Sequence, residues 1–411
     1  MRLDISRRTF LVGGVTGLTF GFMIDFPLAK GVRRASAQDG GFKPNVWVTI
    51  APDNTITIVS PAVEMGQGAM TGMPLLVAEE LDADWARVRI VQAPSNNKAY
   101  GNPGFGGIML TGASRSAPGY FMVLRLAGAQ ARRVVLDAVA AEWNVPVAEL
   151  TTEPSVVVHQ KSNRKLSYGD VAKFAKAPAE LPKVAEADLK KPSQFRLIGK
   201  KIARVEMPDK VTGQAKFGID SEVPDMVYAS VLRTPVQGNG PDTIDDSAAK
   251  NVAGVTHVVP LPWGVGVVGT GYEAVQKGKA ALKVTWKKGA AAERYNSDEV
   301  LGDYAGIAVS LGGSKKGLVV REEGDLAAGT KKAVRSFNAL YLSDHVYHAT
   351  MEPMNAVARV SADGTSCELW VPTQTPAVNQ LAAAGALKTT PDKITVHTTL
   401  LGGGFGRRLE Q

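Results

Sequence analysis

The spacing of apolar and polar residues predicts a mixture of strands and helices in the first half of the chain. Residues 46–61 ("VWVTIAPDNTITIVSP") alternate on both sides of Pro52-Asp53-Asn54, which predicts a β-hairpin. Apolar residues at helical spacing predict helices over Thr71–Leu81 and Gly119–Trp143, and the second of these ends before Pro146. A strand is expected between them at "ARVRIVQAPS".

The second half of the chain continues this mixture. A lysine- and proline-rich stretch at 173–192 predicts a linker, residues 198–288 combine strands with one helix, and 289–332 read as a surface connection. Further strands are expected over 333–349, 356–374 and 394–401, with a helix over Ala377–Leu387. Because helices and strands are both expected along the chain and no internal repeat is visible, we predict an α+β fold.

Composition places this 411-residue chain among globular proteins, because 45% of its residues are hydrophobic and 21% are charged. The net charge is +8, but the lysines and arginines are scattered in short pairs such as Lys315–Lys316. A nucleic-acid interface needs clustered positive charge. We therefore predict no nucleic-acid partner.

One cysteine and five histidines limit the redox and metal chemistry of the chain. Cys367 alone excludes an internal disulfide, a cysteine-ligated iron–sulfur cluster within the chain and a c-type haem site. His345 and His348 are three residues apart, but no carboxylate or cysteine completes a spaced ligand set, so a structural role is favoured over metal binding. We predict no metal ligand from the protein.

The first 37 residues have the form of a twin-arginine signal peptide. Arg7–Arg8 precede an apolar stretch, and "ASAQ" at Ala35–Gln38 offers a cleavage site after Ala37. A membrane anchor is the alternative, but Asp25 and Pro27 interrupt the apolar run. The twin-arginine route exports folded proteins, which suits a protein that acquires a bulky cofactor before export to the periplasm.

Three loops share one chemistry, in which small residues lie beside polar side chains. They are Gly66-Gln67-Gly68, Thr111–Ser116 ("TGASRS") and Gly402–Arg408 ("GGGFGRR"). Glycines let backbone N–H groups approach an anion, and Ser, Thr, Gln and Arg supply further donors. Each loop alone could be a plain strand-to-helix connection, but together with Arg115, Arg407 and Arg408 they indicate a polyanionic cofactor.

Other common catalytic patterns do not fit. No loop is followed by G-K-[ST], none has G-x-G-x-x-G after a first strand, and no serine stands in G-x-S-x-G. Glu352, in the methionine-rich segment "HATMEPMNAVA", could be a general base or a hydrogen-bonded structural carboxylate. We favour the structural role.

Four segments together resemble the molybdenum-binding subunits of the xanthine dehydrogenase/aldehyde oxidase family. They are "VEMGQGAMTGMPLLVAEELDADWARVRI", "HATMEPMNAVA", "WVPTQTP" and "GGGFGRRLEQ", and the resemblance covers most of residues 42–411. The most similar branch contains isoquinoline 1-oxidoreductase beta subunits and exported aldehyde dehydrogenases. In that branch the MGQG segment precedes the region that resembles an α/β hammerhead domain, whereas in other members it follows the GGGFG loop.

The resemblance implies a molybdopterin cofactor, expected in its cytosine dinucleotide form, whose metal is held by the pterin. It implies that Gln374 hydrogen-bonds an oxo ligand of molybdenum, that Gly404, Phe405 and Gly406 cover the metal face, and that Gln67 contacts the pterin or its phosphate. The remaining cofactor-binding residues that we expect are Gly66, Gly68, Thr111, Ser114, Arg115, Ser116, Gly403 and Arg407. Arg408 and Leu409 stand where other members carry substrate-recognising residues, which argues against a purine substrate.

The reaction implied is hydroxylation of an N-heteroaromatic compound or an aldehyde, with oxygen from water. The alternatives are the large subunit of a membrane-associated aldehyde dehydrogenase and a non-catalytic periplasmic cofactor-binding module. The family's glutamate base belongs to a motif beyond residue 411, so we expect a C-terminally truncated fold that is inactive by itself. Electrons would leave through a small 2Fe–2S partner subunit, and in the periplasm through a cytochrome c subunit.

This interpretation divides the chain into five parts. They are a signal peptide (1–37), a molybdopterin-binding segment with the GQG motif (38–172), a linker (173–197), a hammerhead domain (198–290) and the start of the main molybdopterin-binding domain (291–411).

Overall fold

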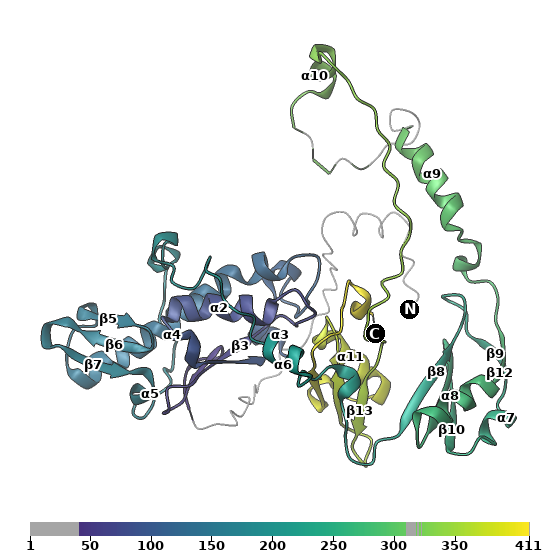
Figure 1. Ribbon diagram of the computed structural model, residues 1–411, viewed down its shortest axis with the longest axis horizontal. Helices are drawn as coiled ribbons and strands as arrows, with labels where there is room; N and C mark the ends of the chain where they lie inside the picture. Colours follow the sequence, from purple (N-terminus) through teal and green to yellow (C-terminus); the bar gives the residue numbers. More distant parts are fainter. Residues whose placement is uncertain (1–40, 310–317, 319, 322, 411) are drawn as a thin grey trace. The chain divides into compact units, whose positions relative to one another are not determined.

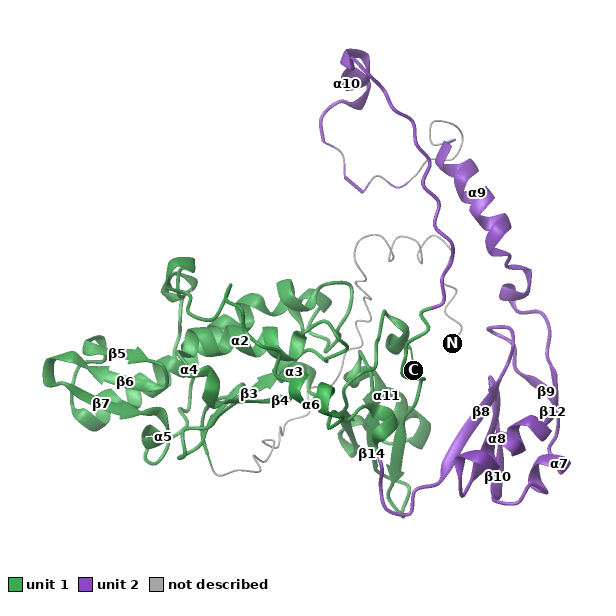
Figure 2. Ribbon diagram, in the orientation of Figure 1, with its two compact units in different colours: residues 1–221, 348–411 green, residues 222–347 purple. Residues whose placement is uncertain are grey.

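A computed structural model describes residues 41–309, 318, 320–321 and 323–410. The signal peptide predicted for residues 1–37 lies outside these residues. The chain forms two compact units (Figure 2), of which the first contains residues 1–221 and 348–411 and the second contains residues 222–347. These limits differ from the predicted boundaries at 198 and 290: the second unit begins at Glu222, and the chain returns to the first unit at His348.

The first unit begins with a four-stranded sheet in the order β1 (Phe42–Asn45), β2 (Val48–Ile50), β3 (Ile56–Ser60) and β4 (Val88–Gln92). β2 and β3 pair antiparallel, with Val48 opposite Ile58, which confirms the predicted hairpin. β3 and β4 are parallel, so the chain must cross over between them, and it does so through helix α2 (Ala69–Leu81).

Helix α4 (Ser116–Trp143) packs along α2 and covers the same core (Figure 1), so both predicted helices are present. Asn144 caps the C-terminus of α4. Its backbone is left-handed, and its N–H group donates to the carbonyl groups of Ala140 and Ala141, shortly before Pro146. A three-stranded sheet of β5 (Leu150–Glu153), β6 (Val156–His159) and β7 (Arg164–Ser167) follows. Short helices α3, α5 and α6 span Asn97–Tyr100, Tyr168–Val171 and Met207–Thr212.

The predicted linker at 173–197 is tied to α2 through two buried carboxylates. Glu79 accepts N–H bonds from Arg196, Leu197 and Ile198, and Glu80 pairs with Arg125 of α4 at 2.7 Å. Burial raises the pKa of Glu79, but these N–H bonds and the ammonium of Lys190 outweigh it, so the pKa lies below its ordinary value. The end of this segment is therefore part of the first unit's packing.

The C-terminal part of the first unit is a second small layer. Strands β13 (Val357–Val360), β14 (Cys367–Val371) and β15 (Ile394–Thr398) form one sheet, and helix α11 (Pro376–Leu387) is the crossover between the parallel strands β14 and β15. Both the strands and the helix agree with the predicted pattern. The last strand leads into the glycine loop at 402–406.

The second unit contains one helix-covered sheet and one strand pair. β8 (Tyr228–Arg233), β10 (Val255–Leu261) and β11 (Gly264–Gly269) form the sheet, while β9 (Pro241–Asp245) pairs with β12 (Lys283–Trp286). Helix α8 (Tyr272–Ala281) packs on β8 and β11, and α7 spans Ser247–Lys250. Helices α9 (Ser297–Val309) and α10 (Leu326–Lys332) lie in the stretch predicted as a surface connection.

The strand predicted over 333–349 is wrong for the structure described here. These residues form no strand, and the side chains of Phe337, Tyr341 and Val346 are 82%, 91% and 81% exposed. A strand requires a neighbouring strand to satisfy its N–H and C=O groups, and alternation of residues does not supply one. Among the residues described, no helix combines the length and apolar character needed to cross a bilayer.

Candidate functional site

The structure brings the three loops identified in the sequence together within the first unit, around Gln374. The backbone N–H of Thr111 donates to the carbonyl of Gln374 at 2.9 Å, and the Gln374 side-chain amide donates to the carbonyl of Thr111 at 2.7 Å. The side-chain oxygen of Gln374 accepts the N–H of Gly406 at 3.1 Å. Gln374 therefore joins the TGASRS loop to the GGGFG loop.

The GQG segment is attached to the same two loops. Val63 donates its N–H to Thr111 Oγ1 at 3.1 Å, and Leu401 donates its N–H to the carbonyl of Glu64 at 3.0 Å. Residues from the two ends of the described sequence thus form one surface, which we call the loop cluster (residues 63–70, 111–117, 374 and 402–408).

Gln374 itself is only 2% exposed, and both polar atoms of its side chain are hydrogen-bonded to the loops. The structure shows that Gln374 connects the TGASRS loop to the GGGFG loop through these hydrogen bonds. Its contact with a molybdenum oxo group stays a prediction.

The GQG turn differs from the expectation in how its donors are used. The N–H groups of Gly66 and Gly68 donate to the carboxylate of Glu64 at 2.8 and 3.1 Å. The side chain of Gln67 closes its own turn, accepting from Met65 N and donating to Val63 O. The donors that we assigned to a cofactor anion are therefore occupied by the protein.

Part of the TGASRS loop and the helix start that follows it have backbone donors without an acceptor among the described residues, although Thr111 N and Arg115 N are both hydrogen-bonded. Ala113 and Ser114 have left-handed backbones, with φ of 47° and 54°, immediately before α4 begins at Ser116. Within the described chain, the N–H groups of Ala113, Ser114, Ser116 and Ala117 donate to no other residue. The Arg115 guanidinium donates to the carbonyl of Gly104 at 2.8 Å and lies over the Phe105 ring, so its side chain supports the loop from within.

The GGGFG loop is compact and has an unusual backbone. Gly403, Phe405 and Gly406 have φ of 96°, 51° and 97°. A Cβ on Gly404 would lie 2.5 Å from the sulfur of Met65 and 2.9 Å from the side-chain oxygen of Gln374, so a larger residue there would have to displace one of these side chains. Phe405 is 70% exposed.

Donors remain available on this loop as well. Among the residues described, the N–H groups of Gly403, Gly404 and Phe405 have no acceptor. Arg407 pairs with Glu410, but its buried Nε has no hydrogen-bond partner within the part of the chain that the structure describes. A buried donor without a partner is costly, so an acceptor from outside the described residues would stabilise this position.

A buried ion pair, Glu352–Arg408, holds the GGGFG loop. One Glu352 oxygen accepts from Gly402 N and Arg408 Nη2, both at 2.8 Å, and the other accepts from Ile219 N and Asn355 Nδ2, both at 3.0 Å. Arg408 also donates through Nε to the carbonyl of Gly403 at 2.8 Å. This agrees with the structural role favoured for Glu352.

Arg408 is 1% exposed, and burial lowers the pKa of its guanidinium, while the Glu352 carboxylate opposes that effect. Its side chain is hydrogen-bonded to Gly403 and Glu352 in the interior. Arg408 therefore packs behind the loop and does not face a substrate.

The loop cluster can hold a polyanion by its donor chemistry. Among the described residues, two loops that both bond to Gln374 have seven backbone N–H groups without an acceptor (Ala113, Ser114, Ser116, Ala117, Gly403, Gly404 and Phe405), and the Nε of Arg407 is also without a partner there. Backbone N–H groups in left-handed turns and at a helix N-terminus favour phosphate and other anions. No group of three or more His, Cys, Asp or Glu side chains suited to a metal ion occurs among the residues described.

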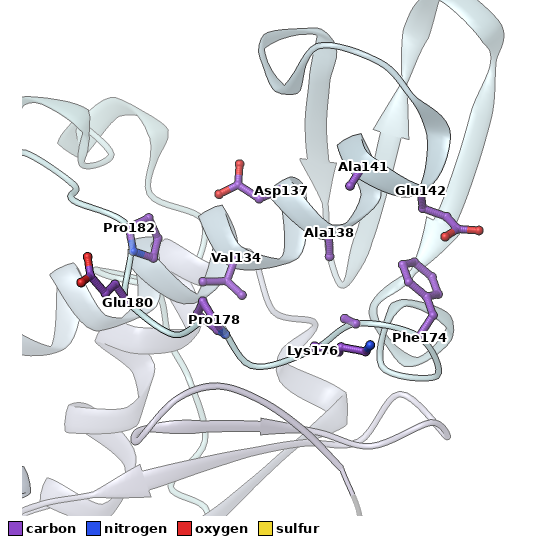
Figure 3. Close-up of a pocket in the computed structure, with 11 residues that line it drawn as sticks. Val134, Asp137, Ala138, Ala141, Glu142, Phe174, Lys176, Pro178, Glu180 and Pro182 are labelled. Atoms are coloured by element: carbon purple, nitrogen blue, oxygen red, sulfur yellow. The ribbon is translucent and has the colours of Figure 1, made fainter.

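A surface hollow beside the C-terminal half of α4 does not fit the same ligand (Figure 3). Its polar lining consists of the carboxylates of Asp137, Glu142 and Glu180 and one ammonium, that of Lys176. These carboxylates would repel phosphate groups. None of the predicted cofactor-binding residues lines it.

Sequence reasoning missed Glu64, Arg204 and the loop-holding role of Arg408. A carboxylate two residues before a glycine turn that opens a helix is a recognisable capping signal, and Glu64 fits it. The pairing of Arg204 with Glu64 at 3.0 Å joins residues 140 apart and has no local signal.

Comparison with known proteins gives the same picture. Residues 14–218 and 313–411 each match a molybdopterin cofactor-binding domain, and these ranges contain all three loops. The chain is 42% identical to isoquinoline 1-oxidoreductase subunit beta of Brevundimonas diminuta, over 99% of this chain and 56% of that protein. It is 32% identical to the membrane-bound aldehyde dehydrogenase [pyrroloquinoline-quinone] of Gluconacetobacter polyoxogenes, over 99% of this chain and 52% of that protein.

Among solved structures, quinoline 2-oxidoreductase from Pseudomonas putida 86 is similar, with 19% identity, a TM-score of 0.39 and coverage of 51% of this chain and 31% of that chain. The chain spans about half the length of the curated relatives it matches.

Proposed function

Because this chain belongs to the molybdopterin-binding subunits of the xanthine dehydrogenase/aldehyde oxidase family, we propose that it forms part of a molybdenum hydroxylase that oxidises N-heteroaromatic compounds. The observation that carries the proposal is the set of free donors on two loops that both bond to Gln374. The similarity to isoquinoline 1-oxidoreductase subunit beta supports this substrate class.

The residues of the loop cluster divide the work of binding. The N–H groups of Ala113, Ser114 and the first turn of α4 would hold the phosphates of the cofactor, and those of Gly403–Phe405 would face its metal-bearing end. Gln374 keeps the two loops at a fixed separation. When bound, the cofactor supplies the redox chemistry that places oxygen from water on a substrate carbon.

Several finer features belong to the same proposal. We propose a dinucleotide form of the cofactor, because a pyrophosphate offers more acceptors to these donors than a single phosphate does; the cytosine base is what the family resemblance implies. Electrons pass to a small 2Fe–2S subunit and, in the periplasm, to a cytochrome c. The protein reaches the periplasm by the twin-arginine route, with Arg7–Arg8 as the signal.

An aldehyde dehydrogenase is the second candidate, because the similarity to the Gluconacetobacter enzyme covers 99% of this chain. A non-catalytic cofactor-binding module is the third. Purification of the full-length protein with its partner subunits, followed by metal analysis and acid release of nucleotides, tests the proposal. We expect molybdenum and cytidine monophosphate in equal amounts, with turnover of isoquinoline faster than that of acetaldehyde.

Other results would separate the alternatives. Pyrroloquinoline quinone without molybdenum would refute the molybdenum proposal and favour the second candidate. Stoichiometric molybdenum without turnover of either compound would favour the non-catalytic module. Faster turnover of acetaldehyde would retain the cofactor assignment and replace the substrate class.

A further inference from the structure

The carboxylate of Glu64 lies inside the glycine turn that was expected to receive an anion from outside. Glu64 is 2% exposed, and one of its oxygens accepts from Gly66 N at 2.8 Å, Gly68 N at 3.1 Å and Arg204 Nη2 at 3.0 Å. The other oxygen accepts from Met70 N at 3.0 Å. Four donors thus converge on one buried side chain.

This arrangement is a filled anion site. Successive N–H groups of a turn with left-handed residues form a concave donor surface, and the N-terminus of a helix favours negative charge. Gly66 and Gly68 have φ of 108° and 86°, and α2 begins directly after Gly68 with no cap from the Gly68 position itself. Glu64 supplies the missing cap from four residues upstream.

The same turn supports both donor-bearing loops. The carbonyl of Glu64 accepts the N–H of Leu401, directly before the GGGFG loop, and the neighbouring Val63 donates to Thr111 at the start of the TGASRS loop. Arg204 Nη1 also donates to the carbonyl of Gly66 at 3.0 Å. The position of the turn therefore fixes where the other two loops are anchored.

We propose that Glu64 is a positioning residue, an internal anion that holds the GQG turn in shape and through it aligns the two loops that bind the cofactor. The effect on the cofactor rests on the proposed function, whereas the filled anion site rests on the contacts alone. It follows that the N–H groups of Gly66, Gly68 and Met70 do not bind cofactor phosphate, because a phosphate there would have to displace a carboxylate held by four donors.

The test uses the full-length protein with its partner subunits and three variants, Glu64→Ala, Glu64→Gln and Glu64→Asp. Glu153→Gln is the matched control, because Glu153 is an exposed carboxylate of the same unit and pairs with the exposed Lys165. Molybdenum content, cofactor dissociation and thermal midpoint are measured for each, with and without added sodium acetate. Sodium chloride at the same ionic strength controls for screening.

Acetate corresponds to the γ carbon and the carboxylate group that Glu64→Ala removes. We expect Glu64→Ala to weaken cofactor retention about 10- to 100-fold, as is usual for groups that orient primary ligands. Acetate, but not chloride, should restore the thermal midpoint and the molybdenum content of Glu64→Ala, and it should leave the wild type and Glu153→Gln unchanged. Glu64→Gln should show the loss without the rescue, because its amide still fills the site and meets the N–H donors with an N–H₂ group.

Retention of molybdenum by Glu64→Ala at the wild-type level would overturn the positioning role. A Glu64→Ala protein whose thermal midpoint does not respond to acetate would overturn the filled anion site. If the wild type contains no molybdenum, the proposed function fails, while the acetate response of the midpoint still decides whether Glu64 is the internal anion. If Glu64→Ala does not accumulate, the comparison of Glu64→Asp with Glu64→Gln replaces it: a carboxylate requirement predicts partial retention for Asp and loss for Gln, and the reverse order overturns the proposal.

Discussion

Replacing Glu352 by glutamine should destabilise the first unit far more than removal of an exposed carboxylate. The Glu352–Arg408 pair is almost inaccessible to solvent, with the two side chains 4% and 0% exposed and 2.8 Å apart. Glu352→Gln leaves the guanidinium buried without a counter-ion and turns an amide N–H₂ group toward backbone donors. Breaking a buried pair on one side costs about 3–5 kcal/mol. Since whole domains have only about 5–15 kcal/mol of stability, this is a large fraction.

Urea unfolding followed by near-ultraviolet circular dichroism measures the change, read from the transition midpoint at a constant slope. Glu368→Gln is the control, because the Arg359–Glu368 pair is 52% and 37% exposed and its loss should cost less than about 1 kcal/mol. The double variant Glu352→Gln/Arg408→Met should recover part of the loss, because it removes the unpaired charge. A Glu352→Gln protein within about 1 kcal/mol of the wild type would refute the conclusion that the pair holds the glycine loop.

Three other predictions concern the site, the pH response and export. Gln374→Ala should lower molybdenum content and activity more than Gln130→Ala, because Gln374 joins two loops whereas Gln130 makes one bond at 3.4 Å; equal values would remove Gln374 from the site. Folding lowers the pKa of Glu79, so the stability that its carboxylate contributes is fully present above the pKa of the unfolded chain and is lost as the pH falls through the pKa of the folded protein. The thermal midpoint of Glu79→Gln should therefore vary less with pH than that of the wild type below about pH 4.5. Arg7–Arg8→Lys–Lys should keep the protein in the cytoplasm, as cell fractionation would show, and unchanged export would contradict the signal assignment.

The elements that the sequence predicted correctly depend on local patterns. The β2–β3 hairpin follows period-two alternation around Pro52-Asp53-Asn54, and α4 follows helical spacing that ends just before Pro146. Residues 333–349 show a similar apolar pattern but form no strand in the described structure, because pairing is a property of two segments.

Only part of the candidate site could be predicted, because local motifs are visible in the sequence whereas contacts between distant segments are not. Its three glycine loops were visible as motifs, and the structure brings them together around Gln374. The sequence did not reveal that Glu64 already occupies the donors of Gly66 and Gly68, or that Arg408 points into the protein toward Glu352. Whether a charged side chain is buried depends on distant segments, and no local spacing encodes it.

The bonds between Thr111 and Gln374 have a consequence for the order of events during biosynthesis. The two residues are 263 positions apart, so the hydrogen bonds that join them form only after nearly all of the described chain has left the ribosome. Bringing such distant segments together costs chain entropy that nearby contacts must first offset. A nascent chain that ends before Gln374 lacks the residue that joins the two loops, so under the proposed function we expect cofactor insertion to follow the synthesis of most of the described chain.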